Sequence, residues 1–407
     1  MGRTARDNRP NLKPVQRIEL SEGNVKARII AVIVFALLGI GTIAYAMFSM
    51  LGSKSGWETI EANNGSLGDI SKEFVFTYRL GAADMSPTAE KKALTTLYTN
   101  LTRKAYQIFL ANERYNDVTG LYALNVNPNT ELTIDPALYK ALQTVTADGS
   151  RVIYLAPLYS QYAAVFYSRE DAEAAEYDPM KNAELTEEVQ TLLGYVNDPT
   201  SVDLTFLGEN RVCLKVSDEY KTYLSENWGT DYLDFGWMRN AFIADYIADG
   251  LLAAGYQNGV LTSCDGFVRN MYAGKEKGSF AVYHRDGNVV KQEFSMEFDN
   301  ARNFVFLHDY PLGVMESEHY YEYTDGTIRC PYVDSADGNT KAVADTLIVY
   351  APQSQGLGCS GLLMHAIKAY VTDDLNTAAL AEMGAQNINY LFFLKNQIVT
   401  NDETLSK

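Results

Sequence analysis

The sequence has few residues of the types that build metal and redox sites. Its 407 residues include four cysteines and four histidines. No two cysteines have the close spacing of zinc or thiol-redox motifs, and the histidines show no metalloprotease spacing. A zinc site or a dithiol centre is therefore not expected. Disulfides and buried free thiols are both open alternatives for the cysteines, which are Cys213, Cys264, Cys330 and Cys359.

Basic residues are scarce after the first 51 positions. The chain has 34 Lys and Arg against 51 Asp and Glu, and residues 1–28 take seven of the basic and three of the acidic ones. Because residues 29–51 carry no charge, the rest has 27 basic and 48 acidic residues, a net charge of −21 (27 minus 48). Nucleic-acid phosphates and anionic lipid headgroups both attract proteins through cations. This composition excludes nucleic acid as a partner and flat docking on such a lipid surface.

One long apolar run begins at Ile29 and ends at Leu51, and its 23 residues include no charged side chain. At ~1.5 Å per residue the run forms a helix about 35 Å long, enough to cross a hydrocarbon core of roughly 30 Å. Residues 1–28 carry four more positive than negative charges (seven minus three), which favours a cytoplasmic location. The sequence therefore predicts a single-pass protein of the cell membrane, with residues 1–28 inside and the remainder outside.

A cleaved signal peptide is the alternative interpretation of this run, because Ala44 and Ala46 fit a cleavage site. The preceding segment is long for a signal peptide, however, and the apolar run continues past Ala46. A retained transmembrane helix over residues 29–51 is therefore preferred. A linker over residues 52–73, rich in Gly, Ser and Asn at its start, and one extracytoplasmic domain over residues 74–407 complete the predicted organisation.

The extracytoplasmic part predicts helices and strands in mixed order, which is typical of an α+β or mixed α/β domain. Asp135 before Pro136 is a favourable helix start, and the Asp325-Gly326 pair favours a hairpin turn. Residues 125–135 predict a polar loop. The expected helices cover residues 87–112, 136–146, 237–254 and 361–371. The expected strands cover residues 74–80, 203–207, 211–216, 260–262, 279–284, 289–294, 304–307, 346–351 and 389–394, with a hairpin over 320–330.

Six segments follow one another in the order and spacing of the motifs of one enzyme family. They cover residues 116–139, 234–245, 255–266, 314–320, 334–338 and 346–351 with the helix after it. Residues 234–245, for example, read D-F-G-W-M-R-N-A-F-I-A-D where the family has D-L-G-G-I-A-K-G-Y-A-V-D. Over residues 74–402 the chain thus resembles the FAD:protein FMN transferases, also called ApbE-like flavin transferases. The resemblance implies an ApbE-like fold.

Members of this family move the FMN half of FAD to a Thr of a partner protein outside the cytoplasmic membrane. The resemblance therefore implies FAD and magnesium as cofactors if the activity is retained, and an extracytoplasmic protein as partner. In the family an Asp and a Thr on the last helix hold magnesium, and a Lys and a His lie in the site. Transfer of a phosphoryl group requires such neutralisation of charge.

This sequence departs from the family at the positions that carry its chemistry. The Lys falls on Asn240, the second Gly of the motif quoted above on Trp237, and the His on Pro331. The magnesium-binding Asp and Thr fall on Gly358 and Leu362. Loss of oxygen ligands removes the main attraction for magnesium. We therefore expect a non-catalytic binding or scaffold protein, with no catalytic or metal-binding residue assigned.

Three positions that match the family frame are candidates for contact with a nucleotide cofactor: Asp234, Gly236 and Asp265. A purely structural role is the competing interpretation of each of them. The alternative function is a divergent FMN transferase, in which Asp265, Asp345 and Ser360 replace the lost ligands. A third hypothesis is a protein that binds flavin without transferring it.

Overall fold

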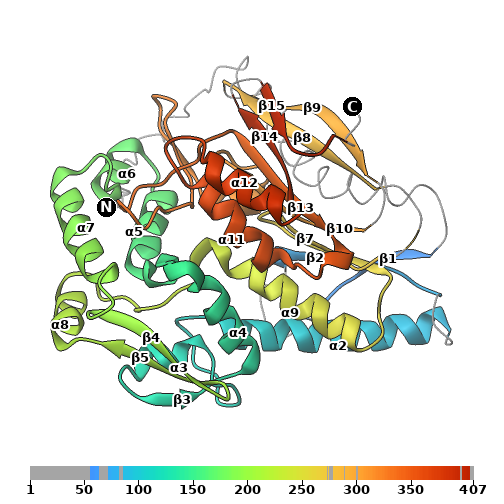
Figure 1. Ribbon diagram of the computed structural model, residues 1–407, viewed down its shortest axis with the longest axis horizontal. Coiled ribbons are helices and arrows are strands. Elements are labelled where there is room, and N and C mark those ends of the chain that lie inside the picture. Colours follow the sequence, from blue (N-terminus) through green and yellow to red (C-terminus); the bar gives the residue numbers. More distant parts are fainter. Residues whose placement is uncertain are drawn as a thin grey trace, which may run out of the picture.

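An eight-stranded sheet is the largest sheet of the described residues and lies in the right half of Figure 1. Its strands follow the order β1-β2-β6-β7-β10-β13-β14-β15, and every neighbouring pair is antiparallel. The strands are β1 (Trp57–Ile60), β2 (Phe74–Arg79), β6 (Gly259–Ser263), β7 (Phe267–Asn270), β10 (Arg302–His308), β13 (Thr346–Pro352), β14 (Asn389–Leu394) and β15 (Gln397–Thr400).

The computed structural model describes residues 56–63, 72–81, 86–272, 274, 278–287, 289–298, 301–394 and 397–403. The predicted cytoplasmic tail and transmembrane helix lie outside the described residues. Within the described ranges, no helix is both long enough and apolar enough to cross a membrane.

Two layers of side chains cover the opposite faces of the sheet, because successive residues of a strand point to opposite faces. In β13, Leu347 and Val349 join the core under the helices, whereas Ile348 and Tyr350 join a second cluster on the other face. The long hairpin of β8 (Gly278–Asp286) and β9 (Val289–Phe298) supplies Phe280 to this second cluster. The buried centre of β13 is therefore apolar on both faces.

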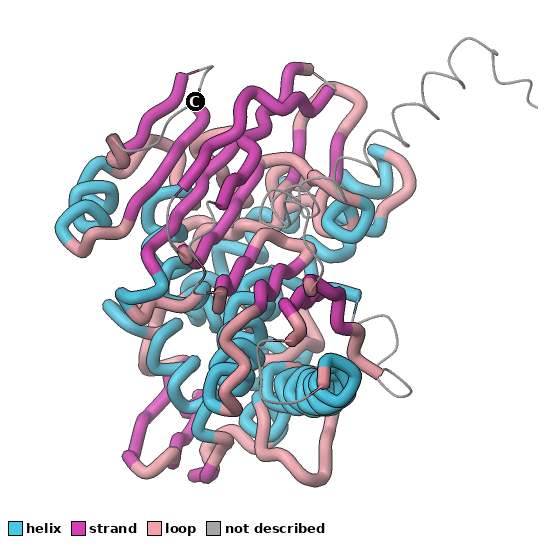
Figure 2. Tube along the Cα trace, turned by 90° about the vertical axis from the view of Figure 1, so that its right-hand side faces the viewer, coloured by secondary structure: helices cyan, strands magenta, loops and turns pink. Residues whose placement is uncertain are grey.

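Helices pack on one face of the sheet (Figures 1 and 2). They are α2 (Pro87–Phe109), α9 (Arg239–Ala253), α11 (Cys359–Tyr370) and α12 (Thr377–Ala385), with α4 (Pro136–Val145) beside them. The helices α2 and α9 approach closely where Gly250 faces Leu101, because a Cβ at Gly250 would lie 2.5 Å from a Leu101 methyl. The C-terminal part of α9 therefore lies close against α2, and α9 also contacts α11 and the sheet.

A second group of elements lies at the side of these helices (Figure 1). It contains α3 (Leu121–Val126), α5 (Ala156–Tyr167), α6 (Asp171–Tyr177), α7 (Ala183–Val196), α8 (Asp218–Asn227) and a small sheet of β3 (Glu131–Thr133), β5 (Arg211–Val216) and β4 (Val202–Gly208). The short helix α10 (Val314–Ser317) and the hairpin of β11 (Tyr321–Glu322) and β12 (Ile328–Arg329) follow β10 in the chain.

The structure confirms the mixed α/β class and corrects several of the predicted elements. The linker prediction is wrong for Trp57–Ile60, which form β1 and gain the hydrogen bonds of a ladder with β2. The predicted loop over residues 125–135 contains the end of α3 and the strand β3, which pairs with β5. The helices α3, α5 to α8, α10 and α12 and the strands β7 and β15 were not predicted.

Candidate functional site

A largely buried cluster of charged side chains surrounds Arg239, the first residue of α9. The Arg239 guanidinium lies 3.2 and 3.3 Å from the two carboxylate oxygens of Glu73, which directly precedes β2. The Tyr106 hydroxyl of α2 donates to the same carboxylate at 3.0 Å. Beside them, Asn240 Nδ2 donates to Asp265 Oδ2 at 3.0 Å. The helices α2 and α9, the residue before β2 and the turn between β6 and β7 therefore contribute polar groups to one place.

Burial favours the protonated form of several carboxyl groups of this cluster. It raises the pKa of Asp265 to about 7, and the nearby Glu73 carboxylate adds to the shift. Burial raises the pKa of Glu316 of α10 to about 8. The Leu312 N–H donates to this carboxyl group at 2.6 Å and lowers its pKa, but burial has the larger effect. Burial also raises the pKa of Asp234. Near neutral pH the cluster is thus less negative than its composition suggests.

Four buried polar atoms around the start of α9 have no hydrogen-bond partner among the described residues. They are Trp237 Nε1, Arg239 Nε, Asn240 Oδ1 and Asp265 Oδ1. A buried polar group without a partner costs roughly 1–3 kcal/mol. In proteins, water or a ligand usually supplies the partners that such buried atoms lack.

Two of the three predicted cofactor contacts have structural roles. Asp234 Oδ1 accepts a hydrogen bond from the Gly236 N–H at 2.9 Å, which shapes the turn before α9. Gly236 has a φ of +52°, and a Cβ there would lie 2.6 Å from the Tyr159 ring. Only glycine therefore fits this position without displacing Tyr159. Asp265 belongs to the cluster around Arg239, and contact of all three residues with a ligand stays a prediction.

The family resemblance places a metal-binding Asp at the start of α11, where this chain has Gly358. A carboxylate from another helix, α9, lies at this position. Asp245 of α9 accepts from Cys359 N at 2.7 Å, and from Ser360 N and Ser360 Oγ at 2.9 and 2.6 Å. A Cβ at Gly358 would lie 2.3 Å from Asp245 Oδ1. The missing side chain at Gly358 thus makes the space that the Asp245 carboxylate occupies.

A buried arginine neutralises this carboxylate. Arg269 of β7 donates to Asp245 Oδ1 at 2.5 Å and to Asp249 Oδ1 at 2.7 Å, and its side chain is 9% exposed. Burial opposes the charge of Arg269, but the two carboxylates outweigh burial and raise the pKa of the guanidinium. A fixed positive charge therefore lies where α9, α11 and the sheet meet.

The residues at the family's metal positions do not fit magnesium. Gly358 has no ligand atom, and Leu362 is a fully buried member of the apolar core. The replacement ligands of the alternative hypothesis do not come together either. Ser360 Oγ donates to Asp245, whereas Asp345 lies beside Asp309 and His284. Within the described ranges, no three His, Cys, Asp or Glu side chains have an arrangement that could hold a metal ion.

Aromatic side chains fill the region next to Trp237. The Trp237 ring packs edge-on against Tyr332, with ring centroids 4.8 Å apart, and Tyr332 packs in turn against the buried Tyr370. His308 is also buried here, and its Nδ1 lies 3.0 Å from Thr346 Oγ1. Burial lowers the pKa of His308 to about 3, so this ring is neutral at physiological pH. This side of the cluster is therefore packed with bulky rings.

Sequence reasoning missed Glu73, Tyr106, Arg239, Glu316 and Arg269. Arg269 is the one residue with a signal in the sequence, because it directly follows the apolar Phe267 and Val268, and a charged residue in a buried strand requires a partner. The other four residues stand next to turns or on amphipathic helices, where polar residues are ordinary. Their convergence depends on the tertiary fold.

The four cysteines are free thiols, which decides between the two alternatives that the sequence left open. Cys213, Cys330 and Cys359 are buried, and Cys264 is partly buried. Burial raises the pKa of Cys264, Cys330 and Cys359, so these thiols are poor nucleophiles.

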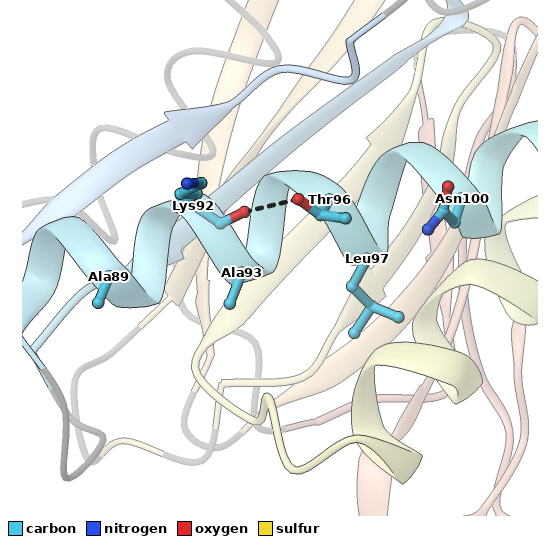
Figure 3. Close-up of a pocket in the computed structure, with 6 residues that line it drawn as sticks. All are labelled: Ala89, Lys92, Ala93, Thr96, Leu97 and Asn100. Atoms are coloured by element: carbon cyan, nitrogen blue, oxygen red, sulfur yellow. Dashed lines mark hydrogen bonds between the residues drawn. The ribbon is translucent and has the colours of Figure 1, made fainter.

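A shallow groove runs along the exposed side of α2 (Figure 3). Its lining consists of small and medium-sized side chains from this helix: Ala89, Lys92, Ala93, Thr96, Leu97 and Asn100. Thr96 Oγ1 donates to the Lys92 carbonyl at 3.0 Å. These groups offer no acid–base pair or metal-ligand set, so the groove is not a candidate catalytic site.

Comparison with known proteins identifies the fold. No protein-family profile matches the sequence, and no curated protein is similar to it. Among solved structures, the ApbE protein of Thermotoga maritima is 14% identical, with a TM-score of 0.53 over 80% of this chain and 93% of that chain. The flavin transferase ApbE of Vibrio cholerae is 12% identical, with a TM-score of 0.53 over 81% and 93%. The chain therefore has the fold of ApbE flavin transferases, as a divergent example, and the predicted resemblance is confirmed at the level of the fold.

Proposed function

We propose that this chain is a membrane-anchored, extracytoplasmic protein with an ApbE-like fold that does not transfer flavin and acts by binding another protein. The observation that carries the proposal is the Asp245–Arg269 pair at the start of α11. It lies next to Gly358, at the position where the resemblance places a ligand of magnesium.

The hydrogen bonds of Asp245 use its full capacity as an acceptor. An ionised carboxylate offers about four lone-pair sites. Asp245 Oδ1 accepts from Cys359 N and Arg269, and Oδ2 accepts from the backbone and hydroxyl of Ser360. A divalent cation would have to displace Arg269, whose side chain is only 9% exposed. The guanidinium thus supplies permanently the positive charge that a metal would otherwise bring.

Two further features support the proposal. The packing of Trp237 against Tyr332 puts a bulky ring where the family motif has glycine, the residue that lets a ligand approach the backbone. The uncharged run over residues 29–51, with its basic N-terminal flank, supports anchoring in the cell membrane with the acidic domain outside.

A flavin-transfer assay tests the proposal. The full chain, in detergent, is mixed with FAD, Mg²⁺ and an acceptor protein that carries a flavin-attachment threonine. The flavin transferase of Vibrio cholerae serves as the positive control. We expect covalent flavin fluorescence on the acceptor in the control reaction alone. Fluorescent acceptor produced by this chain overturns the proposal.

A divergent FMN transferase is the second candidate function. The unpartnered Asn240 Oδ1 and Asp265 Oδ1 favour it, because they could receive donors from a nucleotide. Thermal unfolding with increasing FAD separates the candidates. Stabilisation that Asp265→Asn removes would favour the transferase or a flavin-binding protein. Asp309→Asn is the matched control, since Asp309 is another buried carboxyl group with an unpartnered oxygen.

A further inference from the structure

The short helix α6 is held at both ends by the β11–β12 hairpin. Asp171, its first residue, accepts from Thr324 N at 2.9 Å and from Thr324 Oγ1 at 2.5 Å. Asp178, directly after its last residue, accepts from Tyr323 Oη at 2.9 Å and from Arg329 Nε at 2.8 Å. Both carboxylates are thus bound to the hairpin, which fixes the orientation of the rest of the helix.

The opposite side of α6 presents apolar and acidic side chains to solvent. Glu173, Glu176 and Tyr177 are exposed, and Tyr177 has 42% of its surface accessible. Met180 follows at 43%, and Tyr167 at the end of the adjacent α5 reaches 68%. The Gln161 side chain of α5 donates to the Tyr177 carbonyl at 2.7 Å and joins the two helices. We call this surface of α5, α6 and Met180 the α6 face.

Negative charge concentrates in the same segment. Residues 167–198 contain nine acidic and two basic residues, a net charge of −7 (two minus nine) within a chain of net charge −17. Six of the acidic side chains are exposed and form no ion pair with described residues: Glu170, Glu173, Glu176, Glu184, Glu187 and Glu188. The electrostatic potential at the α6 face is therefore strongly negative.

We propose that the α6 face docks a positively charged segment of a partner protein that also carries apolar side chains. Tyrosine and methionine are enriched at protein interfaces, and a rigid platform loses little entropy on binding. Complementary charge would accelerate association and suppress neutral or acidic partners. A symmetric contact between the α6 faces of two copies does not fit, because two such acidic faces repel each other. The inference rests on the proposed binding function, for which it names the chemistry of the partner.

A fluorescent peptide in which lysines alternate with leucines and glycines is the probe, and the same peptide with glutamate for lysine is its control. Anisotropy measures binding to the full chain in detergent. We expect the lysine peptide to bind and the glutamate peptide not to bind. Because Debye screening shortens the reach of charge, binding should weaken at least about fivefold between 50 and 300 mM salt.

Two charge-reversal variants locate the binding surface. Glu173→Lys with Glu176→Lys should weaken binding of the lysine peptide at least about tenfold, since attraction becomes repulsion. Asp117→Lys with Glu209→Lys makes the same charge change at exposed positions outside the α6 face, and should alter binding less than about twofold. Tyr177→Ser should weaken binding about threefold through lost apolar contact.

Equal weakening by both pairs of reversals, or no binding of the lysine peptide at 50 mM salt, overturns the proposal. Tighter peptide binding after removal of residues 1–28 would identify the chain's own basic tail as the occupant, and would overturn it as well. The measurement involves no flavin. Its failure is therefore distinguishable from failure of the non-catalytic function, which only the transfer assay decides.

Discussion

Replacing Asp245 with alanine should destabilise the protein strongly, because one carboxylate caps α11 and neutralises Arg269. Loss of a helix cap costs about 1–2 kcal/mol. Removing one partner of a buried ion pair costs roughly 3–5 kcal/mol, because a charge is left unpaired. These contributions overlap, and Arg269 keeps its bond to Asp249. We therefore expect a loss of about 3–5 kcal/mol in the free energy of unfolding.

Asp249→Ala is the matched control for this experiment. Asp249 lies on the same helix and binds the same guanidinium, but its side chain is 58% exposed and caps no helix. An exposed ion pair contributes about 0–1 kcal/mol. Urea unfolding followed by tryptophan fluorescence gives both free energies. If Asp245→Ala costs less than about 1 kcal/mol, or no more than Asp249→Ala, the reasoning that Asp245 organises this part of the fold is refuted.

Two further predictions concern the neighbouring buried groups. Burial raises the pKa of Glu316 to about 8, from an ordinary value near 4.5, so its protonated form stabilises the fold at low pH. This stability should fall as the pH rises from about 5 to 8. Urea midpoints measured across that pH range should fall less in the Glu316→Gln variant than in the original protein. The same pH dependence in both proteins would contradict the assignment. Gly358→Asp should lower the melting temperature, because the new Cβ would lie 2.3 Å from Asp245 Oδ1. Adding Asp245→Gly should restore part of the loss. A Gly358→Asp variant as stable as the original would show that the space beside Asp245 is not restricted.

Local signals in the sequence predicted much of the fold. The Asp135 side chain accepts from Ala137 N at 3.0 Å and starts α4 with Pro136, as the capping pattern indicated. The hairpin around Asp325-Gly326 forms at the predicted turn. By contrast, α5 was missed because its sequence A-P-L-Y-S-Q-Y-A-A-V-F-Y is mostly apolar and aromatic, without a clear polar face. Such a run does not show the period of an amphipathic helix.

The candidate site was predictable only in part. The sequence placed Gly358 and Leu362 at former ligand positions, and the structure shows what surrounds them. The sequence gave no indication that Asp245 would cap α11, because Asp245 and Ser360 are 115 residues apart. The charged cluster around Arg239 depends in the same way on the meeting of α2, α9, α10 and the sheet. Contacts between distant segments are set by tertiary packing, which a local pattern does not encode.

Calorimetric titration of Mg²⁺ into the full chain, with and without FAD, tests the central claim most directly. The claim is that Arg269 and Asp245 occupy the place of a metal site. We predict no saturable heat from Mg²⁺ in either titration, and no magnesium-dependent binding of FAD. Saturable magnesium binding that requires FAD, and that Asp245→Asn abolishes, would contradict the claim.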